Sequence, residues 1–292
     1  AGDALTADQM LSDQFDFGGR IELNTGSGAR TVDIREMVRA GAFRYWLAGP
    51  VTTQVIVEDN TPTDRFDVEF NGHKSFHPIF IATFHPGQRS VRIDFIGENT
   101  WMDRLQDITY SLALRTGNPL RQPFYEKANV AHYAASRWRK TGWSGDAPSR
   151  LVIDHNLPYL ISSRAVPNFD LSLSVPDSAV SSEYNSFQAS DRGDLGGRGQ
   201  WAKYFGAIGG RPELGVFPRW DVRYLYTFNA DAETVSRGNA DVSGYVPIHY
   251  RESSTGRRFH PSQPELEAYG RWVSIDARPG FVSRDQAKSI GN

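Results

Sequence analysis

Apolar and polar residues alternate along most of the first half of the chain, as they do in strands with one buried face. Turn sequences rich in Gly, Asn and Pro separate the alternating segments. These segments are residues 43–47, 51–57, 66–70, 76–84, 91–96 and 108–115. Their spacing predicts a mainly antiparallel β-sandwich over residues 43–140. The side chains expected in its core are Trp46, Val55, Phe80, Ile93 and Leu112.

Parts of this half are less regular. Residues 1–30 are rich in Gly, Asp and Ser and alternate only at residues 20–23, so we expect an arm with one edge strand. Asp33 and Glu36 form a capping pair that predicts a short helix after the arm. Residues 124–138 fit a strand or a helix, because their apolar residues also follow a spacing of four, and we favour one long strand.

Helical spacing replaces the alternation in the second half of the chain. Asn156 is placed to cap a helix that ends before Pro167. Pro218 opens a helix, and Asp231 caps another that ends before Gly244, so these two predict an αα-hairpin. Residues 181–210 are Gly-rich without a hydrophobic period and predict a long loop.

These patterns together predict an α+β fold. It consists of a mainly antiparallel β-sandwich followed by a loop-rich segment with an αα-hairpin. We expect one domain at 1–170, which includes the N-terminal arm, and a second segment at 171–292 that begins a larger helical domain.

Composition narrows the classes of function. Lys and Arg total 32, against 34 for Asp and Glu, so the chain has no overall positive charge that would attract a nucleic acid. Nucleic acid is therefore not an expected partner. The chain has no Cys, which excludes disulfides and thiol chemistry, and no apolar run reaches the length of a membrane span. The first residues, Ala1-Gly2-Asp3-Ala4, are typical of a chain cleaved after a signal peptide, so we expect a secreted or cell-surface protein.

Several segments carry a resemblance to known sequences. They are Gly49–Asp59, Trp138–Gly145, Ile153–Asp170, Gly209–Trp220 and Pro247–Arg251. The chain resembles uncharacterised bacterial exported proteins with an N-terminal β-sandwich and a following α-helical region. The resemblance implies no named activity. It implies a helical region like the start of the α/α-toroid found in several polysaccharide-active enzymes.

The segment after Asp170 is too short for a complete toroid. A toroid of six helical hairpins takes roughly 300 residues, and only about 120 remain. Either the sequence is part of a longer protein, or the helical layer is completed by another chain.

Candidate chemistry gathers in the second half of the chain. Glu213 lies between Arg211 and Arg219 and close to Trp220, which suits binding of a sugar or an acidic polymer. The alternative is that these charges form salt bridges that fix a Gly-rich loop. We assign Arg211, Arg219, Trp220 and Arg251 to substrate binding.

The run His249-Tyr250-Arg251-Glu252 offers a base, a phenol and a carboxylate within four residues, as elimination or hydrolysis of a glycan requires. On a strand, His249 and Tyr250 face opposite sides, so only one of them should point into a given site. We assign Glu213, His249 and Tyr250 to catalysis and expect Glu213 and His249 to meet beside the hairpin. No metal or cofactor is expected.

The histidines of the sandwich are interpreted differently. His73, His77 and His85 lack helical pairing, and His77-Pro78 and His85-Pro86 are typical of turns at strand ends. We therefore place the binding site away from these side chains.

Two classes of function remain open. The first is an exported carbohydrate-active protein that acts on a polysaccharide by acid–base chemistry. The second is a structural or assembly subunit of a surface layer, filament or virion, which would self-associate without catalysis. Acidic and aromatic side chains favour the first, and the long polar tail with an incomplete helical layer favours the second.

Overall fold

The computed structural model describes residues 3–26, 28–61, 63–101, 104–145, 152–189, 192–201 and 215–251. The chain divides into two compact units: Ala1–Pro148 with Val246–Asn292, and Ser149–Tyr245. The α+β class is confirmed, since both sheets are antiparallel and most helical residues belong to the second unit. The division into domains at 1–170 and 171–292 stays a prediction.

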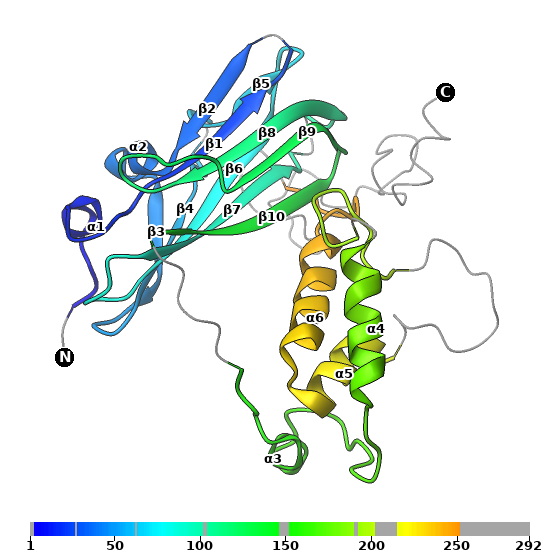
Figure 1. Cartoon of the computed structure of the whole chain (residues 1–292). Helices are drawn as coiled ribbons and strands as arrows, with labels where there is room; N and C mark the ends of the chain where they lie inside the picture. Colours follow the sequence, from blue (N-terminus) through cyan, green and yellow to red (C-terminus); the bar gives the residue numbers. More distant parts are fainter. Residues whose placement is uncertain are drawn as a thin grey trace, which may run out of the picture. The chain divides into compact units, whose positions relative to one another are not determined.

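Two antiparallel sheets make up the first unit (Figure 1). The described residues of the smaller sheet form four strands in the order β2-β1-β8-β9. Their bounds are β1 Gly19–Asn24, β2 Ala29–Asp33, β8 Ile108–Thr116 and β9 Tyr125–His132. The larger sheet has the order β10-β7-β6-β4-β3, with β5 paired to β6. Its strands are β3 Phe43–Ala48, β4 Thr53–Val57, β5 Val68–Phe70, β6 His73–Phe84, β7 Val91–Asn99 and β10 Ser136–Ser144.

Alternate residues of both sheets meet in one core, as the alternating pattern requires. Phe76 of the larger sheet lies edge-on to Tyr110 of the smaller one, with ring centroids 5.6 Å apart. The Trp138 indole donates a hydrogen bond to the Tyr110 hydroxyl at 2.7 Å. Four of the expected core residues are buried, which confirms the sandwich; they are Val55, Phe80, Ile93 and Leu112.

The expected burial of Trp46 is wrong, because this side chain is 69% exposed. Trp46 lies on β3, an edge strand of the larger sheet. The pairing of β3 with β4 shifts register between Tyr45 and Leu47, and such a bulge turns the intervening side chain away from the regular alternation.

The N-terminal segment contributes Phe15, Phe17 and Ile21 to the core, so the prediction of an arm with an edge strand is wrong. The strand β1 lies inside its sheet, paired on both sides. Phe15 and Phe17 pack edge-on against Phe84, at 5.1 and 4.9 Å between ring centroids. A helix, α1 (Ala7–Leu11), precedes them. The predicted short helix is confirmed as α2 (Ile34–Arg39), capped by the side chain of Asp33.

Residues 124–138 form no single long strand. They contain β9 and the start of β10, separated by a turn in which Ala135 takes a left-handed conformation at φ 60°. The expectation failed because the apolar residues continue through the turn, so the hydrophobic pattern gives no break at that point.

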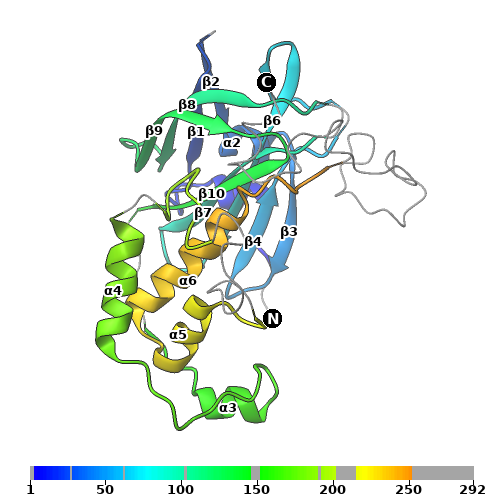
Figure 2. The ribbon, with the colours of Figure 1, turned by 90° about the vertical axis from the view of Figure 1, so that its right-hand side faces the viewer.

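The second unit is helical. Its helices are α3 (Leu157–Ser162), α4 (Asp177–Gln188), α5 (Arg219–Thr227) and α6 (Ala230–Ser243). Figure 2 shows α4 and α5 beside α6. The cap at Asn156 and the αα-hairpin of α5 and α6 are confirmed, although Asn229 and not Asp231 caps α6. The predicted loop over 181–210 is wrong up to Gln188, where α4 ends.

The core of this unit is small and aromatic. Phe187, Trp220 and Val235 form it, and Trp201 packs edge-on to Trp220 at 5.4 Å between ring centroids. The hairpin therefore buries Trp220 and Val235, whereas Leu225 is only half-buried. In the described parts of the chain, no helix is long and apolar enough to cross a bilayer.

Candidate functional site

A row of charged residues crosses the outer face of the larger sheet. His77 on β6 lies opposite Glu98 on β7, and Glu98 lies opposite Arg137 on β10. Phe76 and Trp138, the neighbours of this row, point into the sandwich core. Since successive side chains of a strand point to opposite faces, His77, Glu98 and Arg137 project from the other face.

A segment from the far end of the described chain covers part of this row. We call residues 246–251 the strap. The backbone N–H of His249 donates to the Ala135 carbonyl at 2.8 Å, and that of Arg251 donates to the Thr100 carbonyl at 2.7 Å. Arg251 also forms an isolated parallel bridge with Trp101. The strap therefore lies along the sandwich as a short extended segment.

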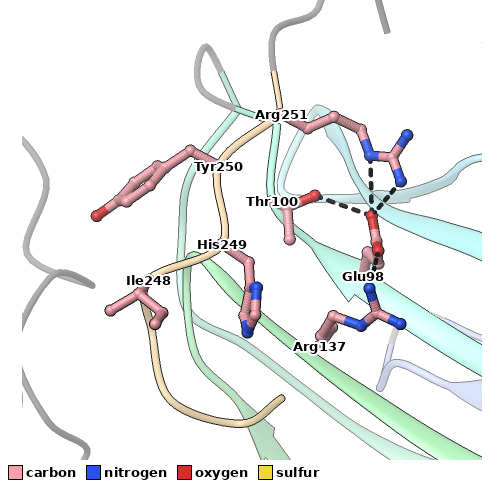
Figure 3. A pocket seen from close by; sticks show the side chains of 7 residues that line it. All are labelled: Glu98, Thr100, Arg137, Ile248, His249, Tyr250 and Arg251. Atoms are coloured by element: carbon pink, nitrogen blue, oxygen red, sulfur yellow. Dashed lines mark hydrogen bonds and ion pairs between the residues drawn. The ribbon is translucent and has the colours of Figure 1, made fainter. Parts of the chain in front are cut away.

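Arg251 is the most strongly paired residue of the strap (Figure 3). Its Nε and Nη2 atoms donate to Oε2 of Glu98 at 2.9 and 2.8 Å, and its Nη1 lies 2.9 Å from Oε1 of Glu58. The guanidinium also lies over the Trp101 ring, 5.8 Å from its centroid. Burial lowers the pKa of Arg251, but the two carboxylates outweigh it and raise the pKa overall.

His77 extends this network on the other side of Glu58. Its Nδ1 lies 2.6 Å from an oxygen of Asp67, and its Nε2 lies 3.4 Å from Oε1 of Glu58. Complete burial of the imidazole by itself lowers its pKa. Asp67, through its charge and hydrogen bond, and Glu58, through its hydrogen bond, outweigh this effect and raise the pKa to about 9. His77 is therefore an imidazolium at neutral pH.

Glu58 and Glu98 are both ionised. Burial raises the pKa of Glu58, yet its bonds to His77 and the charge of Arg251 hold that pKa far below the ordinary value. Glu98 is also buried, which raises its pKa, and Arg251 and Arg137 more than reverse the effect. Glu98 accepts hydrogen bonds from Arg251 and Thr100 and pairs with Arg137 at 3.3 Å. A carboxylate held in this way is a poor proton donor or base.

A cavity of about 160 Å³ opens beside the strap. It is lined by Glu98, Thr100, Arg137, Ile248, His249, Tyr250 and Arg251. Figure 3 shows Glu98 between the guanidinium groups of Arg251 and Arg137. The side chain of His249 extends from the strap on the side of Arg137. Because the charge of Glu98 is already neutralised, the wall offers mainly donors: guanidinium, imidazole and phenol groups. Such a wall suits a small ligand with carboxylate or hydroxyl oxygens.

The structure brings three of the predicted site residues together. His249, Tyr250 and Arg251 all line this cavity, although they follow one another along an extended segment. Figure 3 shows Tyr250 and Arg251 leaving the strap in opposite directions, with Arg251 directed at Glu98. The expectation that only one of His249 and Tyr250 points into a given site is not met, since both line this cavity.

Two of the remaining predicted residues, Arg219 and Trp220, belong to the helical unit. Arg219 pairs with the buried Glu183 at 3.3 Å within the helical unit. Trp220 is buried in the core of that unit, so its ring has no open face to offer a sugar. Arg211 and Glu213 lie outside the described residues, and the meeting of Glu213 with His249 stays a prediction.

The sequence pattern around His77 is misleading. The prediction of a strand-end turn there is wrong, because His77 lies within β6 and pairs with both Asp67 and Glu58. The Pro that follows it is typical of turns, yet here it belongs to the strand. The burial of the Glu58 and Glu98 carboxylates was missed as well. Apolar and polar residues alternate in the same way whether the polar face of a sheet is exposed to solvent or covered by another segment.

Among the residues that the structure describes, no three His, Asp or Glu side chains are grouped to hold a metal ion. Comparison with known proteins adds no family to this description: no family model, curated protein or solved structure matches the chain significantly.

Proposed function

We propose that this chain is an exported carbohydrate-active protein and that the cavity beside the strap binds an acidic sugar of a polysaccharide. One observation carries the proposal: Arg137, Arg251, His249 and Tyr250 line one small cavity around a carboxylate that is already neutralised. The resemblance to exported proteins supports the location outside the cell.

An acidic sugar fits the chemistry of this wall better than a neutral one. Guanidinium groups bind carboxylates through charge-assisted hydrogen bonds, and Arg137 lines the cavity beside Glu98, with which it pairs at 3.3 Å. The imidazole and phenol bind hydroxyl groups, which a sugar supplies along its ring edge. The volume of about 160 Å³ suits one small residue of a polymer and not a long segment.

The same groups support acid–base chemistry by elimination. A guanidinium that neutralises the sugar carboxylate makes the proton on the adjacent carbon easier to remove. In the proposed step the neutral His249 imidazole takes this proton, and the C–H electrons form a carbon–carbon double bond. The neighbouring C–O bond breaks, and the leaving oxygen takes a proton from the Tyr250 phenol. No oxidant or metal is needed for this balance.

Binding tests the proposal directly. Calorimetric titration of the full chain with uronic-acid oligosaccharides and with neutral oligosaccharides of the same length should show binding of the acidic series only. Arg137→Gln should weaken it by about tenfold or more, the loss expected for one charge-assisted pair. Arg139→Gln is the matched control: Arg139 lies on the same strand and pairs with buried Asp94 at 3.1 Å, away from the cavity lining.

Catalysis needs a separate readout. The parent chain should generate unsaturated sugar ends, measured by their ultraviolet absorbance, and His249→Ala should abolish this product while Arg139→Gln keeps it. Equal binding of acidic and neutral sugars, or equal losses in the two arginine variants, would overturn the proposed site.

A structural role is the second candidate, and the edge strand β3 favours it. Tyr45, Trp46 and Leu47 are exposed there at 43%, 69% and 51%, and Val51 follows them at 79%. An apolar edge strand of this kind promotes association between chains. Analytical ultracentrifugation over a range of concentrations should show polymers if this role is correct, and Trp46→Lys should then dissolve them.

A further inference from the structure

We propose that Arg251 is the positioning residue of the cavity, and that its seat on Glu58, Glu98 and Trp101 places His249 and Tyr250 at the cavity wall. The inference rests on the proposed function only in its last step, ligand binding. The attachment of the strap can be measured without any ligand.

The side chains of the strap differ in how they are held. Val246 and Ile248 are 40% and 54% exposed, so they remove little apolar surface from water. The buried residues of the strap are Pro247, Tyr250 and Arg251. Of these three residues, Arg251 is the one with a charge, and it pairs with two separate carboxylates. Glu98 lies on β7, and Glu58 directly follows β4.

We call Glu58, Glu98 and Trp101, the three residues that hold the Arg251 side chain, the seat. Its geometry suits a planar guanidinium group. Glu98 takes two donors of Arg251 on one oxygen, and Glu58 takes a third at 2.9 Å. The Trp101 ring closes the seat from one side. A lysine ammonium is a point charge and has no planar fork, so it cannot meet both carboxylates in this geometry.

The seat exists before the strap arrives because other cations hold its carboxylates in place. Arg44 pairs with Glu58 at 2.6 Å, and the imidazolium of His77 lies between Glu58 and Asp67. Arg137 pairs with Glu98 from β10. Arg251 therefore enters a prearranged site, and its side chain fixes the register of the strap against the sandwich.

His249 and Tyr250 precede Arg251 directly, so their positions follow from that register. The backbone N–H groups of His249 and Arg251 bond to carbonyls of Ala135 and Thr100, which lie on either side of the seat. Loss of the Arg251 anchor frees both hydrogen bonds, and the imidazole leaves the wall beside Arg137. The cavity is thus assembled from two distant parts of the sequence.

Hydrogen exchange of the full chain tests the positioning. In Arg251→Ala, exchange of the amides of residues 249–251 should rise by about tenfold or more, while the amides of β6 and β7 stay protected. Arg251→Lys should recover part of the protection, since it keeps the charge but loses the fork. Arg139→Ala, which removes a guanidinium from the same face of the sheet, should leave the strap unchanged.

The same variants are then titrated with uronic-acid oligosaccharides. Affinity should fall in the order parent, Arg251→Lys, Arg251→Ala, in parallel with the exchange of the strap. A strap that stays protected in Arg251→Ala would overturn the positioning role, as would exchange that rises equally throughout the sheet in Arg251→Lys. If the parent binds no acidic sugar, the proposed function fails, while the exchange result still decides the role of Arg251.

Discussion

The buried imidazolium of His77 predicts how stability depends on pH. Its pKa of about 9 lies above the ordinary histidine value of 6.5, although burial alone would lower it, because Asp67 and Glu58 lie against the ring. The charged form therefore stabilises the folded state fully below pH 6.5. This contribution is lost as the pH rises from 6.5 through about 9.

The size of the effect follows from the shift. The difference between 9 and 6.5 corresponds to about 3 kcal/mol, at roughly 1.4 kcal/mol for each pH unit. This is a large fraction of the stability of an ordinary domain, which is about 5–15 kcal/mol. The ring is completely buried, so solvent screening does not reduce the interaction much.

Urea unfolding at about pH 6 and about pH 9.5 measures this contribution, with the free energy of unfolding falling by about 3 kcal/mol across the window. His77→Gln should be less stable at the lower pH and should lose most of the slope. His73→Gln is the matched control, because His73 begins the same strand and is exposed. A parent free energy that stays flat, or a slope that survives in His77→Gln, would refute a charged His77.

Two further predictions concern packing. Gly97→Ala should cost about 1–3 kcal/mol in thermal or urea unfolding, because a Cβ there would lie 2.5 Å from the Trp138 ring and 2.6 Å from that of Phe76; an unchanged midpoint would contradict this. Trp220→Ala should cost about 3–5 kcal/mol and melt the helical unit, measured by circular dichroism, whereas Trp46→Ala should change unfolding by less than about 0.5 kcal/mol. Equal losses in the two tryptophan variants would show that burial does not separate them.

Much of the sandwich could be predicted because burial imposes a period of two on the sequence. Val55, Phe80, Ile93 and Leu112 are buried, as their alternation indicates. The pattern fails at Trp46, since it cannot distinguish an edge strand with a bulge from a central strand.

The helical unit shows a different limit. Helix α4 was missed because its sequence is rich in Ser, and among its apolar residues only Val180 and Phe187 are fully buried. Its residues therefore give a weak hydrophobic period. The packing of Phe187 on Trp220 and Val235, which supports this helix, depends on residues far along the chain.

The site was only half accessible to sequence reasoning. His249, Tyr250 and Arg251 could be found because reactive types follow one another directly. Their partners Glu58 and Glu98 could not, because nothing local links residues separated by 193 and 153 positions (251 − 58 and 251 − 98). Only the three-dimensional structure shows that Arg251 lies between these two carboxylates.

The return of the strap to the sandwich has a consequence for the order of synthesis. The ribosome delivers Glu58 and Glu98 long before Arg251, and the whole helical unit is made in between. At about 5–20 residues per second, the 103 residues from Pro148 to Arg251 (251 − 148) take roughly 5–20 s. During that interval the nascent sandwich carries the anions of Glu58 and Glu98 without the cation that they share. A chain halted at Pro148 stays in this state permanently, so an N-terminal fragment is a poor substitute for the intact protein in any assay of this site.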